Sequence, residues 1–241
     1  MSNKGIFTLP QRGYSAKVNT VARQADGSVL LQQGGTVLLA TAVSTKTDSF
    51  PGFFPLGVDY REPFCAAGKI PGGFFRREGK SSDKEVLTSR IIDRAIRPLF
   101  PKDYFNQVQV TVIVYSVDKE HTPHLLAPLA ASIALSVSKI PFMGPVGVAE
   151  VSRLDGKWVI DAPYEQSLES DVKITVVGTE DGICMVEGST NEISESDFVE
   201  ALFLAHASIK EQVAWQKEIL TQFVIEKETS NLDVNRSEEH T

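Results

Sequence analysis

Two aromatic and two basic residues stand together in a segment that glycines flank on both sides. The segment reads, in order, Gly72, Gly73, Phe74, Phe75, Arg76, Arg77, Glu78 and Gly79. Glycines allow the backbone to turn where a side chain would clash. Aromatic rings stack on bases, and guanidinium groups neutralise phosphates. The combination predicts a loop that binds single-stranded nucleic acid, because two adjacent exposed phenyl rings need a partner.

A helix with an arginine stripe is expected directly after this loop. Ser82 and Glu85 have the spacing of a capping box, and Pro98 marks the end of the helix. Three basic residues share one face at i, i+4 and i+7: Arg90, Arg94 and Arg97. Aligned like charges are mildly unfavourable without an anion, so the stripe predicts a ligand that carries phosphates.

An alternative interpretation needs no ligand. In it Phe74 and Phe75 belong to the hydrophobic core, and the arginines form structural ion pairs. Their partners would be nearby carboxylates: Asp83, Glu85 and Asp93. Structural ion pairs are common in proteins, so the residues alone leave both interpretations open.

Groups with the spacing of a catalytic or metal site are scarce elsewhere in the chain. The four histidines do not have metal-ligand spacing, and no nucleophile elbow, Walker loop or dinucleotide fingerprint is present. Glu165, Glu169 and Asp171 could bind a divalent ion or form a solvated loop. We therefore expect no catalytic residue and no metal site in this chain.

The composition is that of a soluble globular protein of 241 residues, with 42% hydrophobic residues and no apolar run of membrane-spanning length. The N-terminus lacks a secretory signal, and the isolated Cys65 and Cys184 fit a reducing cytoplasm. The net charge of −7 is unusual for a nucleic-acid binder. The positive charge is concentrated, since seven of the 24 Lys and Arg residues lie between Arg76 and Arg97.

The periodicity predicts an α+β fold in which helices pack on mixed β-sheets. Helices are expected from Ser82 to about residue 97, over 123–138, and from Ser194 to about residue 223. Strands are expected at 7–10, 14–21, 29–33, 36–43, 53–60, 107–117, 148–154, 157–160, 172–178 and 183–187.

Several motifs together are more specific than composition. Residues 66–79 and 89–101, with shorter matches at 22–29, 53–56, 140–142 and 177–180, closely resemble the first core of the bacterial polynucleotide phosphorylase family. The resemblance covers about residues 5–225 and implies a ribonuclease PH-type fold. It implies a first core from residue 1 to about 190 and a long helix over about 191–226, which packs on the core or begins a helical linker. Residues 227–241 are polar and are expected to be a disordered tail.

The resemblance implies that the full-length enzyme is a homotrimer that degrades mRNA from its 3′ end. Inorganic phosphate is the co-substrate, nucleoside diphosphates are released, and Mg²⁺ is needed by the full-length enzyme but is not expected on this chain. The Phe-Phe-Arg-Arg loop would line the RNA channel, and the helix arginines would approach the RNA. Single-stranded RNA is the implied partner, with other RNA-degradation proteins as further candidates, in the cytoplasm.

In this family the catalytic residues belong to the second core. There a serine triplet at a helix start binds phosphate, and an Asp-x-Lys motif binds the metal. The approximate alignment places Thr122–His124 at the triplet and Lys173–Thr175 at the Asp-x-Lys motif. A lysine at the position of a magnesium-binding carboxylate would repel the ion, so this core is expected to guide RNA without catalysing its cleavage.

Two other functions are compatible with these features. The chain could be a free-standing, non-catalytic RNA-binding or scaffold subunit of an exosome-like ring. It could also be a self-sufficient ribonuclease PH enzyme, although the missing Asp-x-Lys motif argues against that. A reading frame that continues into a second core would indicate a phosphorylase, and one that does not would indicate the free-standing subunit.

Overall fold

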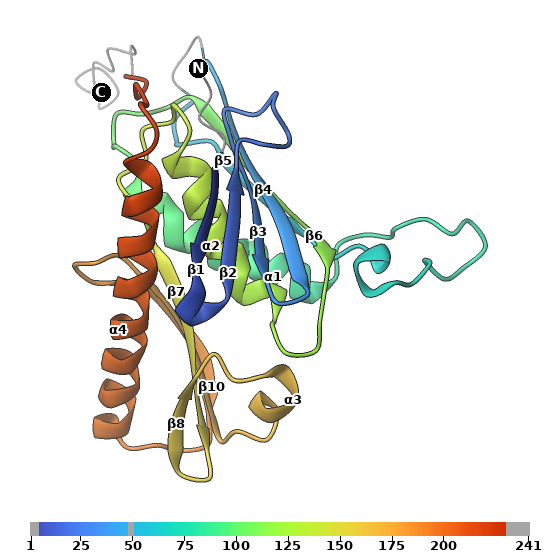
Figure 1. The fold of residues 1–241 in the computed structure, drawn as a ribbon, viewed down its shortest axis with the longest axis vertical. Helices are drawn as coiled ribbons and strands as arrows, with labels where there is room; N and C mark the ends of the chain where they lie inside the picture. Colours follow the sequence, from blue (N-terminus) through green and yellow to red (C-terminus); the bar gives the residue numbers. More distant parts are fainter. Residues whose placement is uncertain (1–4, 48–50, 230–241) are drawn as a thin grey trace, which may run out of the picture.

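The computed structural model describes residues 5–47 and 51–229, and its larger sheet has six strands (Figure 1). Their spatial order is β1-β2-β3-β4-β6-β5. The bounds are β1 Gly5–Leu9, β2 Tyr14–Val18, β3 Gly27–Gln33, β4 Thr36–Thr45, β5 Leu56–Arg61 and β6 Gln107–Ser116. Neighbours are antiparallel, except that β5 runs parallel to β6. Pro55 precedes β5, which lies at the sheet edge where a missing backbone N–H is tolerated.

The smaller sheet has four antiparallel strands in the order β10-β9-β7-β8. Its strands are β7 Gly147–Leu154, β8 Lys157–Ile160, β9 Val172–Gly178 and β10 Ile183–Thr190. A four-residue helix, α3 (Tyr164–Ser167), which the sequence pattern did not predict, lies between β8 and β9. Two mixed layers of strands and helices confirm the predicted α+β class.

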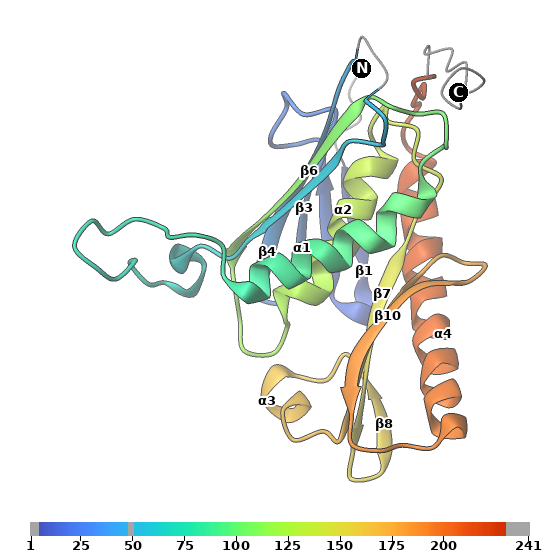
Figure 2. The same cartoon turned by 180° about the vertical axis from the view of Figure 1, so that it is seen from behind.

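Helix α2 (Pro123–Ser136) lies at the centre of the molecule between the two sheets, and all its residues from Leu125 to Ser136 are buried. A helix that is apolar on all sides is stable only when protein surrounds it. Helix α1 (Asp83–Ile96) packs beside α2 and against β5 (Figure 2). The predicted capping box is confirmed, because the Ser82 hydroxyl and the Glu85 carboxylate each accept a backbone N–H of the other residue.

Helix α4 (Glu195–Leu220) runs along the smaller sheet and then beside the larger one (Figure 1). Ala205, Ile209 and Val213 pack with buried residues of β7 and β9 in a second core cluster. Two glutamines of α4, Gln212 and Gln216, are also buried. No helix within residues 5–47 and 51–229 is long and apolar enough to cross a membrane.

The predicted disordered tail spans residues 227–241, of which 230–241 lie outside the described residues. Within the described residues 227–229, Lys227 and Glu228 contact the end of α2 and the residues just after it. The Lys227 ammonium donates to the carbonyl oxygens of Ser136 (2.9 Å) and Ser138 (2.8 Å) at the end of α2. Glu228 forms an ion pair with Lys139 at 2.8 Å.

Candidate nucleic-acid interface

Residues 62–82, which we name the arm, project from the body between β5 and α1 (Figures 1 and 2). Near its tip, Phe74 is 94% exposed and Phe75 is 79% exposed. The two rings meet edge to face, with centroids 5.3 Å apart. This exposure excludes the alternative in which both phenylalanines belong to the core.

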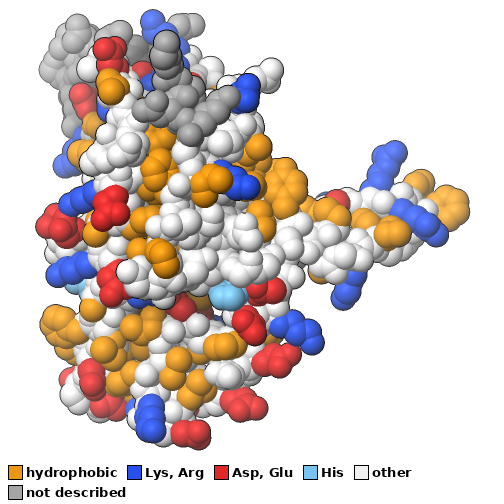
Figure 3. All heavy atoms as spheres, viewed as in Figure 1, with side chains coloured by type: hydrophobic (Ala, Val, Ile, Leu, Met, Phe, Trp, Pro, Cys, Tyr) orange, Lys and Arg blue, Asp and Glu red, His pale blue; other side chains and the backbone are white. Residues whose placement is uncertain are grey.

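Arg76 and Arg77 are exposed on the same arm, and neither forms an ion pair within the described part of the chain. Arg76 has a φ of 48°, in the left-handed region, and Gly73 has a φ of 84°. These angles turn the chain sharply on both sides of the phenylalanines. Figure 3 shows hydrophobic and basic side chains along the outer part of the arm. Rings and guanidinium groups are therefore presented together to solvent.

The three arginines of α1 differ in their surroundings. The Arg97 guanidinium donates to both oxygens of Asp93, at 2.6 and 2.9 Å, and also to two backbone carbonyls. Arg94 forms an ion pair with Glu187 of β10 at 3.0 Å. Arg90 is exposed and has no ion-pair partner among the described residues. Two of these three arginines thus have carboxylate partners inside the chain, whereas Arg76 and Arg77 have none within residues 5–47 and 51–229.

Carboxylates fix the base of the arm. Glu85 accepts the backbone N–H of Ser82 at 2.7 Å and that of Glu62 at 2.8 Å. Partial burial would raise the pKa of Glu85, but these hydrogen bonds outweigh burial and lower it. Glu78 accepts the backbone N–H of Phe64 at 3.0 Å. Both carboxylates therefore hold backbone groups at the base of the arm, while Arg76 and Arg77 lie further out.

The segments aligned with the catalytic motifs of the phosphorylase family meet around Glu150, which is only 2% exposed. One oxygen of its carboxylate, Oε2, lies 3.5 Å from Lys173 Nζ and 3.8 Å from His124 Nε2. The Thr175 hydroxyl is 3.5 Å from the same oxygen. An internal ammonium group thus neutralises the buried carboxylate.

This cluster does not fit the Mg²⁺ ion that the resemblance implies for the full-length enzyme. Magnesium prefers oxygen ligands, chiefly carboxylates and water. Around Glu150 the neighbours are an ammonium, an imidazole and a hydroxyl. Within residues 5–47 and 51–229, no three His, Cys, Asp or Glu side chains are grouped so that they could hold a metal.

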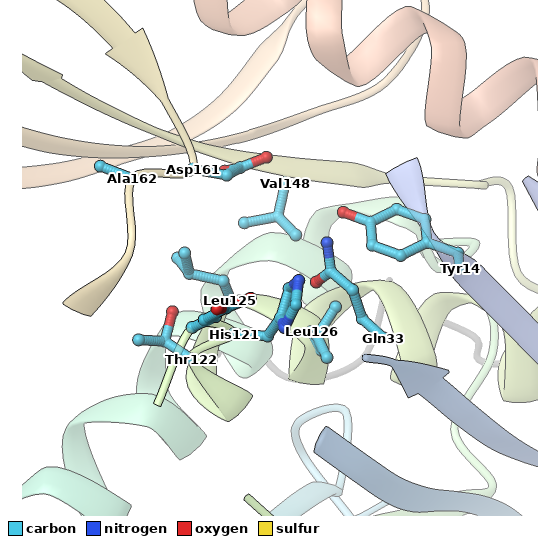
Figure 4. Close-up of a pocket in the computed structure, with 10 residues that line it drawn as sticks. Tyr14, Gln33, His121, Thr122, Leu125, Leu126, Val148, Asp161 and Ala162 are labelled. Carbon is cyan, nitrogen blue, oxygen red and sulfur yellow. The ribbon is translucent and has the colours of Figure 1, made fainter. Parts of the chain in front are cut away.

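A cavity of about 20 Å³ lies at the start of α2 between the two sheets, and Tyr14, Gln33, Thr122, Val148 and Asp161 are among its lining residues (Figure 4). A volume of this size has room for about one water molecule. The helix start that aligns with the phosphate-binding triplet therefore faces a space that is too small for a phosphate group.

Asp161 beside this cavity joins the two halves of the fold. Its carboxylate accepts the Glu150 backbone N–H at 2.9 Å and pairs with Arg12 at 3.1 Å. Arg12 also pairs with Glu211 of α4 at 3.0 Å. Burial, assisted by the charge of Glu150, raises the pKa of Asp161 to about 6, against the opposing effects of the Glu150 N–H hydrogen bond and of Arg12. No local sequence pattern indicates this group, because Arg12, Glu150 and Asp161 are distant from one another in the chain.

Comparison with known proteins decides the family. The profile of the 3′ exoribonuclease family, domain 1, matches residues 11–141, and the profile of domain 2 matches residues 144–208. The chain belongs to the 3′ exoribonuclease family. The two profiles meet between α2 and β7, where the chain passes from the larger sheet to the smaller one.

Relatives within this family are polyribonucleotide nucleotidyltransferases. The one from Thermomicrobium roseum is 53% identical over 200 residues, which is 83% of this chain and 25% of the relative. The one from Heliobacterium modesticaldum is 47% identical over 219 residues, covering 89% of this chain and 31% of the relative. The one from Listeria monocytogenes serotype 4a is 43% identical over 240 residues, covering 99% of this chain and 33% of the relative. The chain thus spans about a third of the length of these relatives or less.

The fold itself is also found in a solved structure. The crystal structure of rice (Oryza sativa) Rrp46 superposes with a TM-score of 0.68 at 17% sequence identity. The match covers 87% of this chain and 95% of the rice chain. This likeness confirms the ribonuclease PH-type fold expected from the sequence.

Proposed function

We propose that this chain is the first, non-catalytic core of a polynucleotide phosphorylase and that it grips single-stranded RNA with its arm. The observation that carries the proposal is the joint exposure of Phe74 and Phe75 beside Arg76 and Arg77, which have no carboxylate partner among the described residues. Rings that can stack and arginines that can pair with phosphates form a sequence-tolerant site for a single strand. The site would extend along α1 through Arg90. Arg94 and Arg97 would join it if phosphates replaced their carboxylate partners.

In the proposed full-length enzyme, three chains form a ring and the arm lines the channel that RNA enters. RNA is shortened from its 3′ end by phosphate attack, which releases nucleoside diphosphates during mRNA degradation in the cytoplasm. The first core runs to about residue 190, and α4 begins the connection to the rest of the enzyme. The chemistry, with its Mg²⁺ and phosphate, lies outside this chain, and other RNA-degradation proteins are candidate partners.

The test is direct binding of RNA to the purified 241-residue chain. Fluorescence anisotropy of a labelled single-stranded oligo(A) should rise on titration with the chain, and the affinity should fall as salt increases. A duplex of the same length should bind more weakly, because its bases cannot stack on the exposed rings. Equal affinity for the duplex and the single strand would contradict the proposal.

The alternative is a free-standing RNA-binding or scaffold subunit of an exosome-like ring. It is favoured by the match to rice Rrp46, because that fold covers 95% of the rice chain and 87% of this one. Sequencing the complete reading frame separates the two functions. A second core of the same fold downstream supports the phosphorylase, whereas a stop codon supports the free-standing subunit.

A further inference from the structure

The outer part of the arm is held by very few contacts. Among the described residues, none from Ile70 to Arg77 makes a hydrogen bond or an ion pair. The contact between the rings of Phe74 and Phe75 lies within this segment and does not tie it to the body. The position of the rings relative to the body must therefore be set by contacts at the base.

The two limbs of the base are attached to different parts of the body. The outgoing limb contains the short helix η2 (Phe64–Ala67), and the Ala66 carbonyl accepts the backbone N–H of Val117 at 3.1 Å, just beyond β6. The returning limb ends at Ser82, in the capping box of α1. A hollow of about 670 Å³ lies between the limbs, and Arg61, Phe64, Glu78 and Lys80 are among its lining residues.

One side chain joins the two limbs above the capping box. The Glu78 carboxylate, on the returning limb, accepts the backbone N–H of Phe64 at 3.0 Å, at the start of η2. No hydrogen bond among the described residues involves Gly79, Lys80 or Ser81, so these residues do not link the two limbs. Loss of the Glu78 contact would lengthen the unattached segment from residues 70–77 to residues 70–81.

We propose that Glu78 is a positioning residue that clamps the arm at its base and thereby holds Phe74 to Arg77 in place for RNA. The inference rests on the proposed function. A carboxylate next to two RNA-binding arginines would weaken RNA binding if it acted through its charge alone. If Glu78 is a clamp, its removal should weaken RNA binding instead of strengthening it. Without the clamp, RNA binding must order a longer part of the arm.

Glu78→Ala and Glu78→Gln separate geometry from charge. Both changes remove the negative charge, but the glutamine Oε1 can still accept the Phe64 N–H. Hydrogen–deuterium exchange of the 241-residue chain measures the clamp without RNA. Amide exchange at Phe64 should rise about tenfold in Glu78→Ala and stay near the wild-type rate in Glu78→Gln. Equal exchange in both variants would overturn the clamp.

Affinity for labelled single-stranded oligo(A) gives the second measurement. Glu78→Ala should weaken binding by about fivefold, whereas Glu78→Gln should bind as well as the wild type or slightly better. An equal gain in both variants would mean that Glu78 acts by charge alone and would overturn the proposal. Thermal unfolding should be the same in all three proteins, because Glu78 is exposed on the arm.

A Phe74→Ala/Phe75→Ala variant in the same assay keeps this inference distinct from the proposed function. If that variant binds oligo(A) more weakly while Glu78→Ala does not, the arm binds RNA and the clamp is wrong. If the double variant binds unchanged, the proposed RNA grip is wrong, and the exchange measurement alone decides whether Glu78 clamps the arm.

Discussion

At the scale of single residues, the arm is unusual because it leaves two phenyl rings in water. Burying such a side chain stabilises a protein by about 1.5–3 kcal/mol, which the free chain forgoes at Phe74 and again at Phe75. A ligand that covers both rings would recover this free energy. RNA bases have the flat apolar faces that can do so, and their phosphates suit the neighbouring arginines.

Phe74→Ala and Phe75→Ala should each weaken binding of single-stranded RNA. The expected loss is about 1–3 kcal/mol for each stacked base, measured by anisotropy at fixed salt. The slope of affinity against salt should not change, because no phosphate contact is removed. Wild-type affinity in both variants would assign these rings to another role.

Arg76→Ala/Arg77→Ala should change the salt dependence instead. Each phosphate contact to a single strand contributes about 0.7 to the slope of log affinity against log salt. Loss of two contacts should therefore flatten the slope by about 1.4. Lys157→Ala provides a comparison, because it removes one positive charge at an exposed position of β8, in the smaller sheet. An unchanged slope in the double variant would show that Arg76 and Arg77 do not contact phosphates.

Asp161 should make folding stability depend on pH. Its folded pKa of about 6 lies above the ordinary value near 4, so the folded chain keeps a proton that the unfolded chain has released. The contribution of this group to stability therefore rises as pH falls through 6. Between about pH 7 and pH 5, the wild type should gain about 1 kcal/mol relative to Asp161→Asn in urea unfolding. Parallel pH profiles would contradict the raised pKa.

At the scale of elements, α4 is joined to the rest of the fold by buried polar groups as well as apolar ones. The Gln212 amide donates to the Val148 carbonyl at 2.6 Å and accepts the Val148 N–H at 2.9 Å. One turn later, the Gln216 amide donates to the Val146 carbonyl at 2.7 Å and accepts the Ser132 hydroxyl at 2.7 Å. These bonds satisfy the backbone where β7 begins and fix the register of α4 against it.

Gln212→Ala should destabilise the chain strongly. It leaves the backbone N–H and carbonyl of Val148 buried without partners, which costs about 1–3 kcal/mol for each group. The expected loss in the free energy of unfolding is therefore about 2–6 kcal/mol. Lys210→Ala, at an exposed position of the same helix, should change stability by less than about 0.5 kcal/mol. Similar effects from both changes would contradict this role of Gln212.

Local signals in the sequence were sufficient to predict most elements. The Ser82–Glu85 capping box and the apolar run of α2 depend on residues close together in the chain, and both predictions are confirmed. Helical periodicity placed Arg94 on the α1 stripe but could not show that β10 brings Glu187 beside it. The same limit applies to Glu150 with Lys173 and to Arg12 with Asp161, because these pairs form only when distant segments fold together.

At the scale of the whole molecule, an acidic chain carries Arg76 and Arg77 on a projection. The net charge of −7 repels a polyanion from most of the surface. The arm, which contains Arg76 and Arg77, projects away from the body (Figures 1 and 2), and that repulsion is weaker there. This arrangement favours contact of RNA with the tip of the arm rather than with the body.

The purified 241-residue chain should not degrade RNA. The buried carboxylate of Glu150 is neutralised by Lys173, and the cavity at the start of α2 has room for only about one water molecule. Incubation of poly(A) with phosphate and Mg²⁺ should therefore release no nucleoside diphosphate above a blank without protein. If the wild-type chain releases nucleoside diphosphate and Lys173→Ala does not, our interpretation of this cluster is contradicted.

The central claim, that RNA contacts the tip of the arm, is tested most directly by mapping photocrosslinks between this chain and a photoreactive single-stranded oligo(A). Peptide mass spectrometry should locate the crosslinks mainly between Ile70 and Arg77, and excess unlabelled oligo(A) should suppress them. Crosslinks on α4 or the smaller sheet, with none on the arm, would contradict the claim.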